Sequence, residues 1–268
     1  MNNSLTTVVK NGSVRPIITA SLKPPFEKPT HGAIKNRIVD YWSQRVEAFS
    51  AQRLKELTSE KHELWMNELE RFIPMDKSLN ILDLGTGTGF FSFLLSAAGH
   101  RATGIDLTEG MIEEAREMSK HLGIPVDFLV MDAEAPDFAP QSFDVLVTRN
   151  LTWTLPHLEA AYAAWRGLLK PGGVLINFDA DYCHENKDQK IPENHAHKNI
   201  APELKLEYER LKDDLRPGQR LRPEWDKELL LKAGFHRILA DVSVYERIYR
   251  DFDEFYNPTP IFMITAYA

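Results

Sequence analysis

The middle of the chain alternates between two hydrophobic patterns. Short apolar runs that end in polar or acidic residues are typical of buried strands, and each is followed by a longer stretch with helical spacing. We expect strands at 80–84, 101–106, 125–132, 142–150 and 173–181, and helices at 89–99, 108–123 and 155–173. Strands separated by helices of this length predict right-handed crossovers and a parallel sheet.

The two ends of the chain read differently. Residues 1–32 are rich in Pro, Asn, Ser and Thr and predict an irregular arm. A helical stripe from 33 to 72 predicts two helices, broken near Ser50 or Ser59. Residues 182–222 are polar and then amphipathic, which favours a lid attached after the fifth strand. A helix at 222–235 and strands at 238–249 and 261–268 then close the sheet.

The fold class that follows is α/β. We expect a doubly wound, Rossmann-like sheet of seven mostly parallel strands with helices on both faces. We expect one domain over 33–268, with N-terminal helices at 33–75 and the lid at 182–222. The length of 268 residues suits such a domain.

Composition narrows the classes of function. The formal net charge of −7 argues against a binder of nucleic acid. The single cysteine, Cys183, excludes an internal disulfide and a cysteine-rich zinc site. No apolar stretch approaches 18 residues, and the N-terminus shows no secretory signal, so we expect a cytoplasmic protein without a membrane partner.

The stretch GTGTG, residues 85–89, follows the first expected strand and carries the candidate chemistry. In a doubly wound sheet, ligands bind beyond the carboxyl ends of the strands, so this loop lies at the site. A phosphate-binding P-loop needs a lysine that is absent here. A dinucleotide loop, GxGxxG, needs glycine where this chain has Phe90. A loop without any ligand is the remaining structural alternative.

As a set, the motifs resemble those of class I S-adenosylmethionine-dependent methyltransferases. LDLGTGTG is similar to the first motif of that family, and four later segments are similar to its second to fifth motifs: TGIDLTEGMIEEA, VMDAEAPDF, SFDVLVTRNLTW and LLKPGGVLI. The resemblance covers 33–181 and is strongest to the small-molecule branch typified by the ubiquinone/menaquinone (type 11) methyltransferases. It implies S-adenosylmethionine as cofactor, S-adenosylhomocysteine as product and a small-molecule acceptor.

The resemblance also implies roles for individual residues. Asp106 would accept hydrogen bonds from both ribose hydroxyls, and Asp132 would accept one from the adenine amino group, with Ala133 supplying a backbone N–H. The full set of expected cofactor-binding residues is Tyr41, Asp83, Gly85, Thr86, Gly87, Gly89, Asp106, Leu107, Met111, Asp132, Ala133, Glu134, Asn150 and Leu151.

The acceptor must approach the methyl group opposite the sulfur. We expect Trp42, Arg149 and Trp153 on the substrate side, although core packing is the alternative for both tryptophans. Methyl transfer from a sulfonium is an in-line displacement that requires alignment and exclusion of water, so no metal is expected. Where a proton must leave, Asp181 and His184 are the candidate bases; a solvated loop is the alternative. His195 and His197 form only a weak metal-binding pattern.

Two other functions stay open. A nicotinamide-dependent oxidoreductase is disfavoured by Phe90, and a nucleoside-binding protein that has lost catalysis is disfavoured because every expected cofactor position is intact. A methyltransferase of base amino groups would carry an NPPY-type signature, whereas this chain has TRNLTW at 148–153. The identity of the acceptor, and whether the protein forms a homodimer, cannot be decided from the sequence.

Overall fold

The structure is a computed structural model that describes residues 29–185, 190–195, 200–216, 218 and 220–268. Its helices are α1 (His31–Ser43), α2 (Val46–Thr58), α3 (Lys61–Glu70), α4 (Phe90–Ala97), α5 (Glu109–Leu122), α6 (Leu158–Leu168), α7 (Pro202–Leu215), α8 (Glu224–Lys232) and α9 (Val244–Ile248). Its strands are β1 (Asn80–Leu84), β2 (Arg101–Asp106), β3 (Asp127–Val130), β4 (Phe143–Arg149), β5 (Leu169–Ala180), β6 (His236–Asp241) and β7 (Ile261–Tyr267).

The strands form one sheet in the order β3-β2-β1-β4-β5-β7-β6. The first five strands in the chain are parallel, and β7 runs antiparallel to both β5 and β6. The chain reverses its direction across the sheet between β1 and β4, and this switch point leaves a crevice beyond their carboxyl ends. The predicted doubly wound sheet of seven mostly parallel strands is therefore confirmed.

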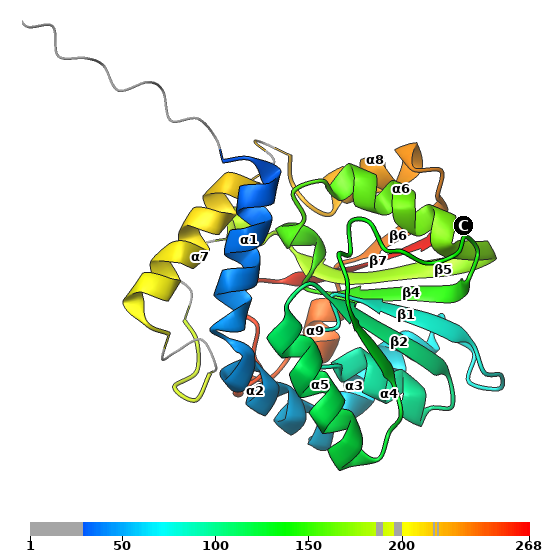
Figure 1. Ribbon diagram of the computed structural model, residues 1–268, viewed down its shortest axis with the longest axis horizontal. Coiled ribbons are helices and arrows are strands. Elements are labelled where there is room, and N and C mark those ends of the chain that lie inside the picture. The colour runs from blue at the N-terminus through cyan, green and yellow to red at the C-terminus, as the bar shows by residue number, and fades with distance from the viewer. Residues whose placement is uncertain (1–28, 186–189, 196–199, 217, 219) are drawn as a thin grey trace, which may run out of the picture.

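Helices cover both faces of the sheet (Figure 1). Side chains of α3, α4 and α9 pack on one face in a core that contains Trp65 and Phe91. Side chains of α6 and α8 pack on the other face around Tyr162 and Trp165. These large aromatic side chains are almost completely removed from water, and the burial of apolar surface is what holds the layers together.

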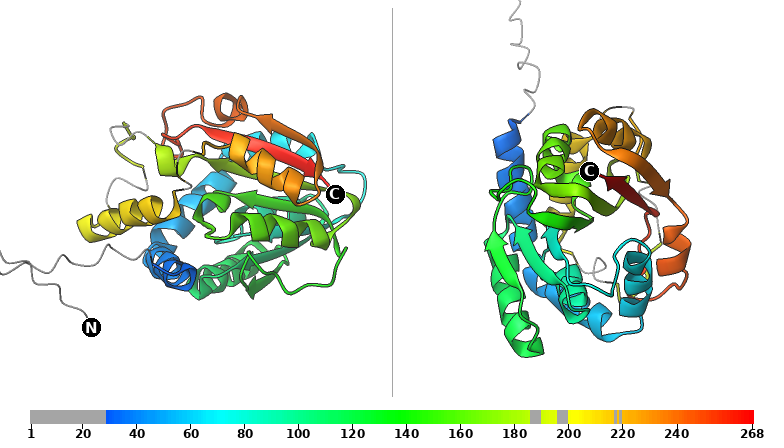
Figure 2. Two further views of the ribbon diagram at one scale, coloured as in Figure 1. Left: turned by 90° about the horizontal axis from the view of Figure 1, so that it is seen from above. Right: turned by 90° about the vertical axis from the view of Figure 1, so that its right-hand side faces the viewer.

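Two helices lie outside this layered core. α1 and α7 pack side by side at the edge of the sheet where the parallel strands end (Figures 1 and 2). α7 belongs to the 182–222 segment that follows β5. The sheet therefore supplies the floor of the crevice, and elements from the N-terminus and from the insertion stand over it.

Several expected boundaries differ from those observed. The expected arm at 1–32 falls mostly outside the described residues, and its last two residues begin α1. The 33–72 stretch forms three helices: the break near Ser59 is present, but Ser50 lies inside α2 and the other break is at 44–45. The strand expected at 238–249 ends at Asp241, because the Asp241 carboxylate accepts hydrogen bonds from Ser243 N and Oγ and so forms the turn that leads into α9.

Candidate functional site

A cavity of about 330 Å³ lies beyond the carboxyl ends of the parallel strands. Of the residues predicted from the sequence, it is lined by Trp42, Gly85, Gly87, Asp106, Leu107, Met111, Asp132, Ala133, Arg149, Asn150, Leu151 and Trp153. The other predicted residues do not line it: Tyr41, Asp83, Thr86, Gly89, Glu134, Asp181 and His184. The cavity therefore joins the loops after four neighbouring strands.

The glycine loop turns from β1 into α4 along the cavity wall. Gly85 and Gly89 have φ angles of 66° and 93°, which side chains with a Cβ rarely adopt. A Cβ on Gly85 would lie 2.7 Å from Leu151 Cδ1, and one on Gly87 would lie 3.1 Å from Phe49 Cε1. The glycines thus allow both the turn and the close approach of neighbouring protein side chains.

Asp83 stabilises the conformation of this loop through hydrogen bonds. Its carboxylate accepts hydrogen bonds from Thr86 Oγ1 at 2.7 Å, Ser92 Oγ at 2.8 Å and Ser92 N at 3.1 Å. Burial raises the pKa of the carboxyl to about 6, and the hydrogen bonds oppose that rise. Asp83 and Thr86, both predicted to bind the cofactor, are therefore placed to shape the loop rather than to line the cavity.

Asp106, at the end of β2, points its carboxylate toward the glycine loop. It accepts hydrogen bonds from Gly87 N at 3.0 Å and Thr108 N at 2.8 Å. Burial raises the pKa of this carboxyl, while the two backbone donors oppose the rise. The acid predicted from the second motif therefore lies beside the loop predicted from the first.

Asp132, at the end of β3, is joined to the N-terminal helix. Lys35 Nζ on α1 lies 2.5 Å from Asp132 Oδ2 and 2.5 Å from Glu134 Oε2. Glu134 turns away from the cavity and also accepts a hydrogen bond from His157 N. Lys35 lines the cavity and was missed in the sequence, because a single lysine on an amphipathic helix carries no signal.

Arg149 ends β4 and borders the cavity, but its guanidinium is already bound by the protein. It donates to Glu56 Oε1 at 2.8 Å and to Tyr249 Oη at 3.1 Å, and it stacks 4.0 Å from the ring centroid of Trp65. Burial and these partners leave little of the side chain for a ligand. The predicted contact between Arg149 and substrate therefore competes with these internal partners.

The N-terminal helix contributes one of its two predicted aromatic residues. Trp42 lines the cavity. Tyr41 is 1% exposed and stacks on Tyr208 of α7, with ring centroids 5.5 Å apart. Burial raises its pKa to about 12. Tyr41 thus packs α1 against α7, which is a different place from the one predicted for it beside the cofactor.

Asp181 and His184 do not line the cavity. His184 Nδ1 lies 2.8 Å from Asp181 Oδ1, and its Nε2 lies 2.9 Å from the carbonyl oxygen of Gly218. Asp181 also accepts a hydrogen bond from Arg222 N at 3.1 Å. We therefore do not carry the predicted base role over to this pair, because both side chains are hydrogen-bonded to the backbone of Gly218 or Arg222.

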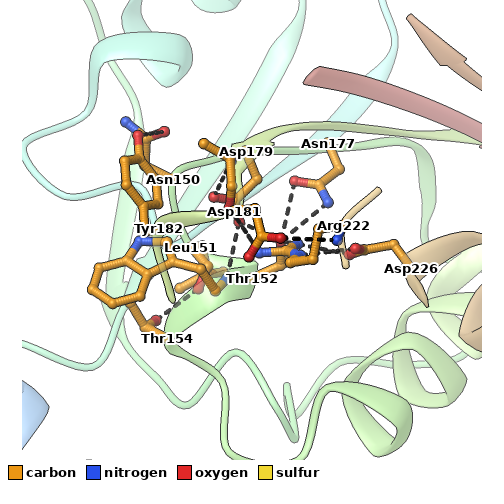
Figure 3. Close-up of polar contacts among 12 residues, drawn as sticks. Asn150, Leu151, Thr152, Thr154, Asn177, Asp179, Asp181, Tyr182, Arg222 and Asp226 are labelled. Carbon is orange, nitrogen blue, oxygen red and sulfur yellow. Dashed lines mark hydrogen bonds and ion pairs between the residues drawn. The ribbon is translucent and has the colours of Figure 1, made fainter. Parts of the chain in front are cut away.

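Next to Asp181 is a buried charged cluster (Figure 3). Arg222 donates to Asp226 at 2.6 Å, to Thr152 Oγ1 at 2.5 Å and to Asp179 at 3.3 Å, and its side chain is 3% exposed. The guanidinium and the two carboxylates satisfy one another, so the cluster joins the end of the insertion to β5 and to the segment after β4.

The sequence predicted a lid at 182–222 but, except for His195, it did not single out the residues of the far wall of the cavity. Tyr182, Glu185, Ile191, His195, Ile200, Lys205, Tyr208 and Glu209 come from the insertion, and Tyr249 and 255–259 come from the segment before β7. His197 lies outside the described residues. Within the part of the chain that the structure describes, no cluster of three or more His, Cys, Asp or Glu side chains is arranged to hold a metal ion.

Comparison with known proteins identifies the core of this arrangement. Residues 81–173 match the family model described as a methyltransferase domain. The match agrees with the resemblance of the sequence motifs to class I methyltransferases. The matched segment contains the glycine loop, Asp106, Asp132 and the exit of β4, which are the parts of the chain that surround one half of the cavity.

Curated relatives match part of the chain. The chain is 35% identical over 123 residues to the ubiquinone/menaquinone biosynthesis C-methyltransferase UbiE of Cereibacter sphaeroides, covering 43% of this chain and 48% of the relative. It is 34% identical over 121 residues to the aklanonic acid methyltransferase DauC of Streptomyces sp. strain C5, covering 40% and 55%. The chain thus spans about half the length of the curated relatives it matches.

Solved structures extend the likeness of fold beyond the matched segment. A SAM-dependent methyltransferase from Aquifex aeolicus superposes with a TM-score of 0.54 at 19% identity, covering 81% of this chain and 97% of that one. The PH0226 protein from Pyrococcus horikoshii OT3 gives a TM-score of 0.56 at 22% identity, covering 79% and 93%. At these identities the likeness shows the class I methyltransferase fold.

Proposed function

We propose that this protein transfers a methyl group from S-adenosylmethionine to a small-molecule acceptor. The observation that carries the proposal is the position of Asp106 and Asp132 at the ends of neighbouring strands, where they line the same cavity as the glycine loop. Two carboxylates suit the hydroxyl and amino donors of a nucleoside. They lie within the matched methyltransferase domain.

The residues of the cavity fit this cofactor better than they fit a dinucleotide. Phe49 covers the glycine loop, so that a Cβ on Gly87 would lie 3.1 Å from its ring. Asp106 lies 3.0 Å from Gly87 N, where it would repel a pyrophosphate. In the proposed complex, Asp106 holds the ribose, Asp132 holds the adenine edge, and the loop lies beside the methionine end.

S-adenosylmethionine supplies an activated methyl group on a positively charged sulfur. The chain itself has to align the acceptor and exclude water. Trp42, Trp153 and Tyr208 surround the space beside the loop, and Tyr208 belongs to the α7 wall. Aromatic faces of this kind favour a sulfonium within about 6 Å. The enclosing insertion and the acidic net charge of −7 support a small acceptor rather than a nucleic acid.

Calorimetric titration of the purified protein tests the proposal. S-adenosylmethionine is expected to bind, and NADH is not. Asp106→Ala should weaken binding at least tenfold, because the ribose loses its hydrogen-bond acceptor in a water-poor cavity. Asp127→Ala is the matched control, since it removes an exposed carboxylate from the opposite end of β3.

Two results would contradict the proposal: binding of NADH without S-adenosylmethionine, or unchanged affinity in Asp106→Ala. Binding without any S-adenosylhomocysteine release across a panel of small acceptors would instead indicate a nucleoside-binding protein without catalysis.

The cytoplasmic location, the extent of the domain over 33–268 and a homodimer stay predictions. Among the described residues, no helix has the length and apolar character needed to span a bilayer.

A further inference from the structure

The switch point divides the cavity into two halves. Gly85, Asp106 and Asp132 lie at or just after the carboxyl ends of β1, β2 and β3, and these strands are on one side of it. Tyr182 follows β5 and Asn257 precedes β7, and these two strands lie on the other side of the switch point. If the first half takes the nucleoside, the second half takes the acceptor, and Asn150 after β4 lies between them.

A chain of hydrogen bonds crosses the acceptor half, and its direction can be worked out from one end. The backbone N–H of Thr259 can only donate, and it donates to Asn257 Oδ1 at 3.2 Å. The Asn257 amide nitrogen therefore faces the Tyr182 hydroxyl and donates to it at 2.9 Å. Because the hydroxyl has one proton, Tyr182 donates that proton to Asn150 Oδ1 at 3.0 Å (Figure 3).

This chain fixes which way the Asn150 amide points. Its oxygen is used by Tyr182, so its nitrogen is the group that it offers to the cavity. None of the hydrogen bonds among the described residues uses that nitrogen. The backbone supports the placement, since Asn150 has a φ of 56° and its own N–H donates to Phe178 O at 2.8 Å. Asn150 thus presents two N–H donors between the halves.

Two charged side chains that border the acceptor half, Glu185 and Arg149, have partners in the protein, and Lys205 on the same wall is exposed. Glu185 lies 2.5 Å from Lys212 Nζ and 2.5 Å from Thr259 Oγ1. Arg149 is bound by Glu56. The rest of this wall includes the aromatic rings of Trp153, Tyr182, Tyr208, Phe255 and Tyr256. Internally paired charges and flat apolar walls favour an uncharged, planar ligand.

We infer that the acceptor is an uncharged, planar molecule with an oxygen atom, that Asn150 donates a hydrogen bond to this oxygen, and that Tyr182 positions Asn150. The inference rests on the proposed function and names its acceptor class. An amide donor selects for a hydrogen-bond acceptor, and a buried donor left unpaired disfavours an analogue that lacks one. Tyr182 acts through Asn150 and is therefore a positioning residue.

Affinity for two matched probes tests the inference. The probes are 1-tetralone and tetralin, which share a bicyclic skeleton and differ by one carbonyl oxygen, titrated into protein saturated with S-adenosylhomocysteine. The ratio of the affinity for 1-tetralone to the affinity for tetralin cancels the effect of general packing. It should fall about three- to tenfold in Tyr182→Phe, which frees the Asn150 amide, and in Asn150→Asp, which replaces its N–H donors by oxygen.

Tyr245→Phe is the matched control. Its hydroxyl donates to the carbonyl oxygen of Asn257 at 3.0 Å, so the change removes a hydroxyl from the same region and leaves the side-chain relay intact. The affinity ratio should stay at the wild-type value in this variant. Melting temperatures of all three variants establish that each is folded before its ratio is compared.

The outcomes separate the inference from the proposed function. Failure of S-adenosylhomocysteine to bind the wild type would overturn the proposed function. With that ligand bound, the inference is overturned if neither probe binds, if the ratio is unchanged in Tyr182→Phe or Asn150→Asp, or if Tyr245→Phe lowers it equally. A ratio that falls only in the two relay variants supports it.

Discussion

Glu56 shows how a buried charge is held beneath the cavity. Its carboxylate is 1% exposed and accepts hydrogen bonds from Arg149 and from Trp65 Nε1, each at 2.8 Å, and it also pairs with Arg53. Burial raises the pKa of such a carboxyl, but the two guanidiniums outweigh that effect and lower it to about 2. The charged form is therefore the one that the fold stabilises.

The stability of the protein should depend on this group in acid. Because the folded pKa lies below the ordinary value of 4.5, the contribution of Glu56 is present above pH 4.5 and is lost as pH falls through about 2. A shift of this size corresponds to about 3 kcal/mol. The free energy of unfolding, measured with urea from pH 5 to pH 2, should fall less steeply in Glu56→Gln than in the wild type.

Glu117→Gln is the control for that measurement. Glu117 is paired with Lys120 on the exposed surface of α5. Its loss should therefore change the fall in unfolding free energy between pH 5 and pH 2 by no more than about 0.5 kcal/mol. Equal slopes for Glu56→Gln and the wild type would show that Arg149 and Arg53 do not stabilise the charge.

Asp106 and Asp132 could be found from the sequence because strand ends carry them, whereas Glu56 could not, because Arg149 is 93 residues away.

At the scale of elements, two charged side chains, one lysine and one arginine, join α1 to its neighbours. Lys35 bridges Asp132 and Glu134, and Arg37 lies 2.6 Å from both Glu207 and Asp214 of α7. α1 thus connects the end of β3 with the insertion. The pairing of Tyr41 with Tyr208 adds an apolar contact to the same interface.

Removal of Lys35 should loosen α1 while the sheet stays intact. In Lys35→Met, backbone amide exchange across 31–43 is expected to speed up about three- to tenfold, because Asp132 and Glu134 lose their shared cation. Exchange in β1 should not change. Hydrogen-exchange mass spectrometry measures both. Lys55→Met, which removes an exposed partner of Glu254, is the control, and equal effects of the two changes would contradict the role given to Lys35.

Element prediction succeeded where pattern and packing agree. Each parallel strand of the sheet was found. The central strands β1, β4 and β5 are largely buried and read as apolar runs, whereas the edge strand β3 is mostly exposed. The strand expected at 238–249 was extended too far because Val244, Tyr245 and Ile248 suit a strand by propensity. Asp241 ends it by accepting hydrogen bonds from Ser243 N and Oγ, and Arg247 then pairs with Asp241. Side-chain capping decided the structure there.

At the scale of the whole molecule, the cavity draws its walls from segments that are far apart in the chain. Its lining runs from Lys35 on α1, through the loops of the sheet, to Thr259 before β7. The sheet loops were predictable, because the family motifs cover them. The far wall was not, since contacts between the insertion and the segment before β7 depend on tertiary packing alone.

A ligand that binds only the folded cavity should stabilise the folded protein. S-adenosylhomocysteine at 100 times its dissociation constant is expected to add about 2.7 kcal/mol, which raises the melting temperature by about 5–10 °C in a chain of this size. Differential scanning calorimetry with and without the ligand measures the shift. NADH at the same concentration is the control, and an unchanged melting temperature with saturating S-adenosylhomocysteine would oppose the proposed site.

The two ends of the insertion meet at the sheet, where Arg222 N donates to Asp181 at 3.1 Å and its guanidinium is held by Asp179 and Asp226. Because both ends of the insertion are held at the sheet in this way, the insertion can be exchanged as a unit. Its length and sequence can drift during evolution without changing strand pairing or the nucleoside half of the cavity. New acceptor preferences can therefore arise by replacing this one segment, and the same boundaries are the natural junctions for a designed chimera.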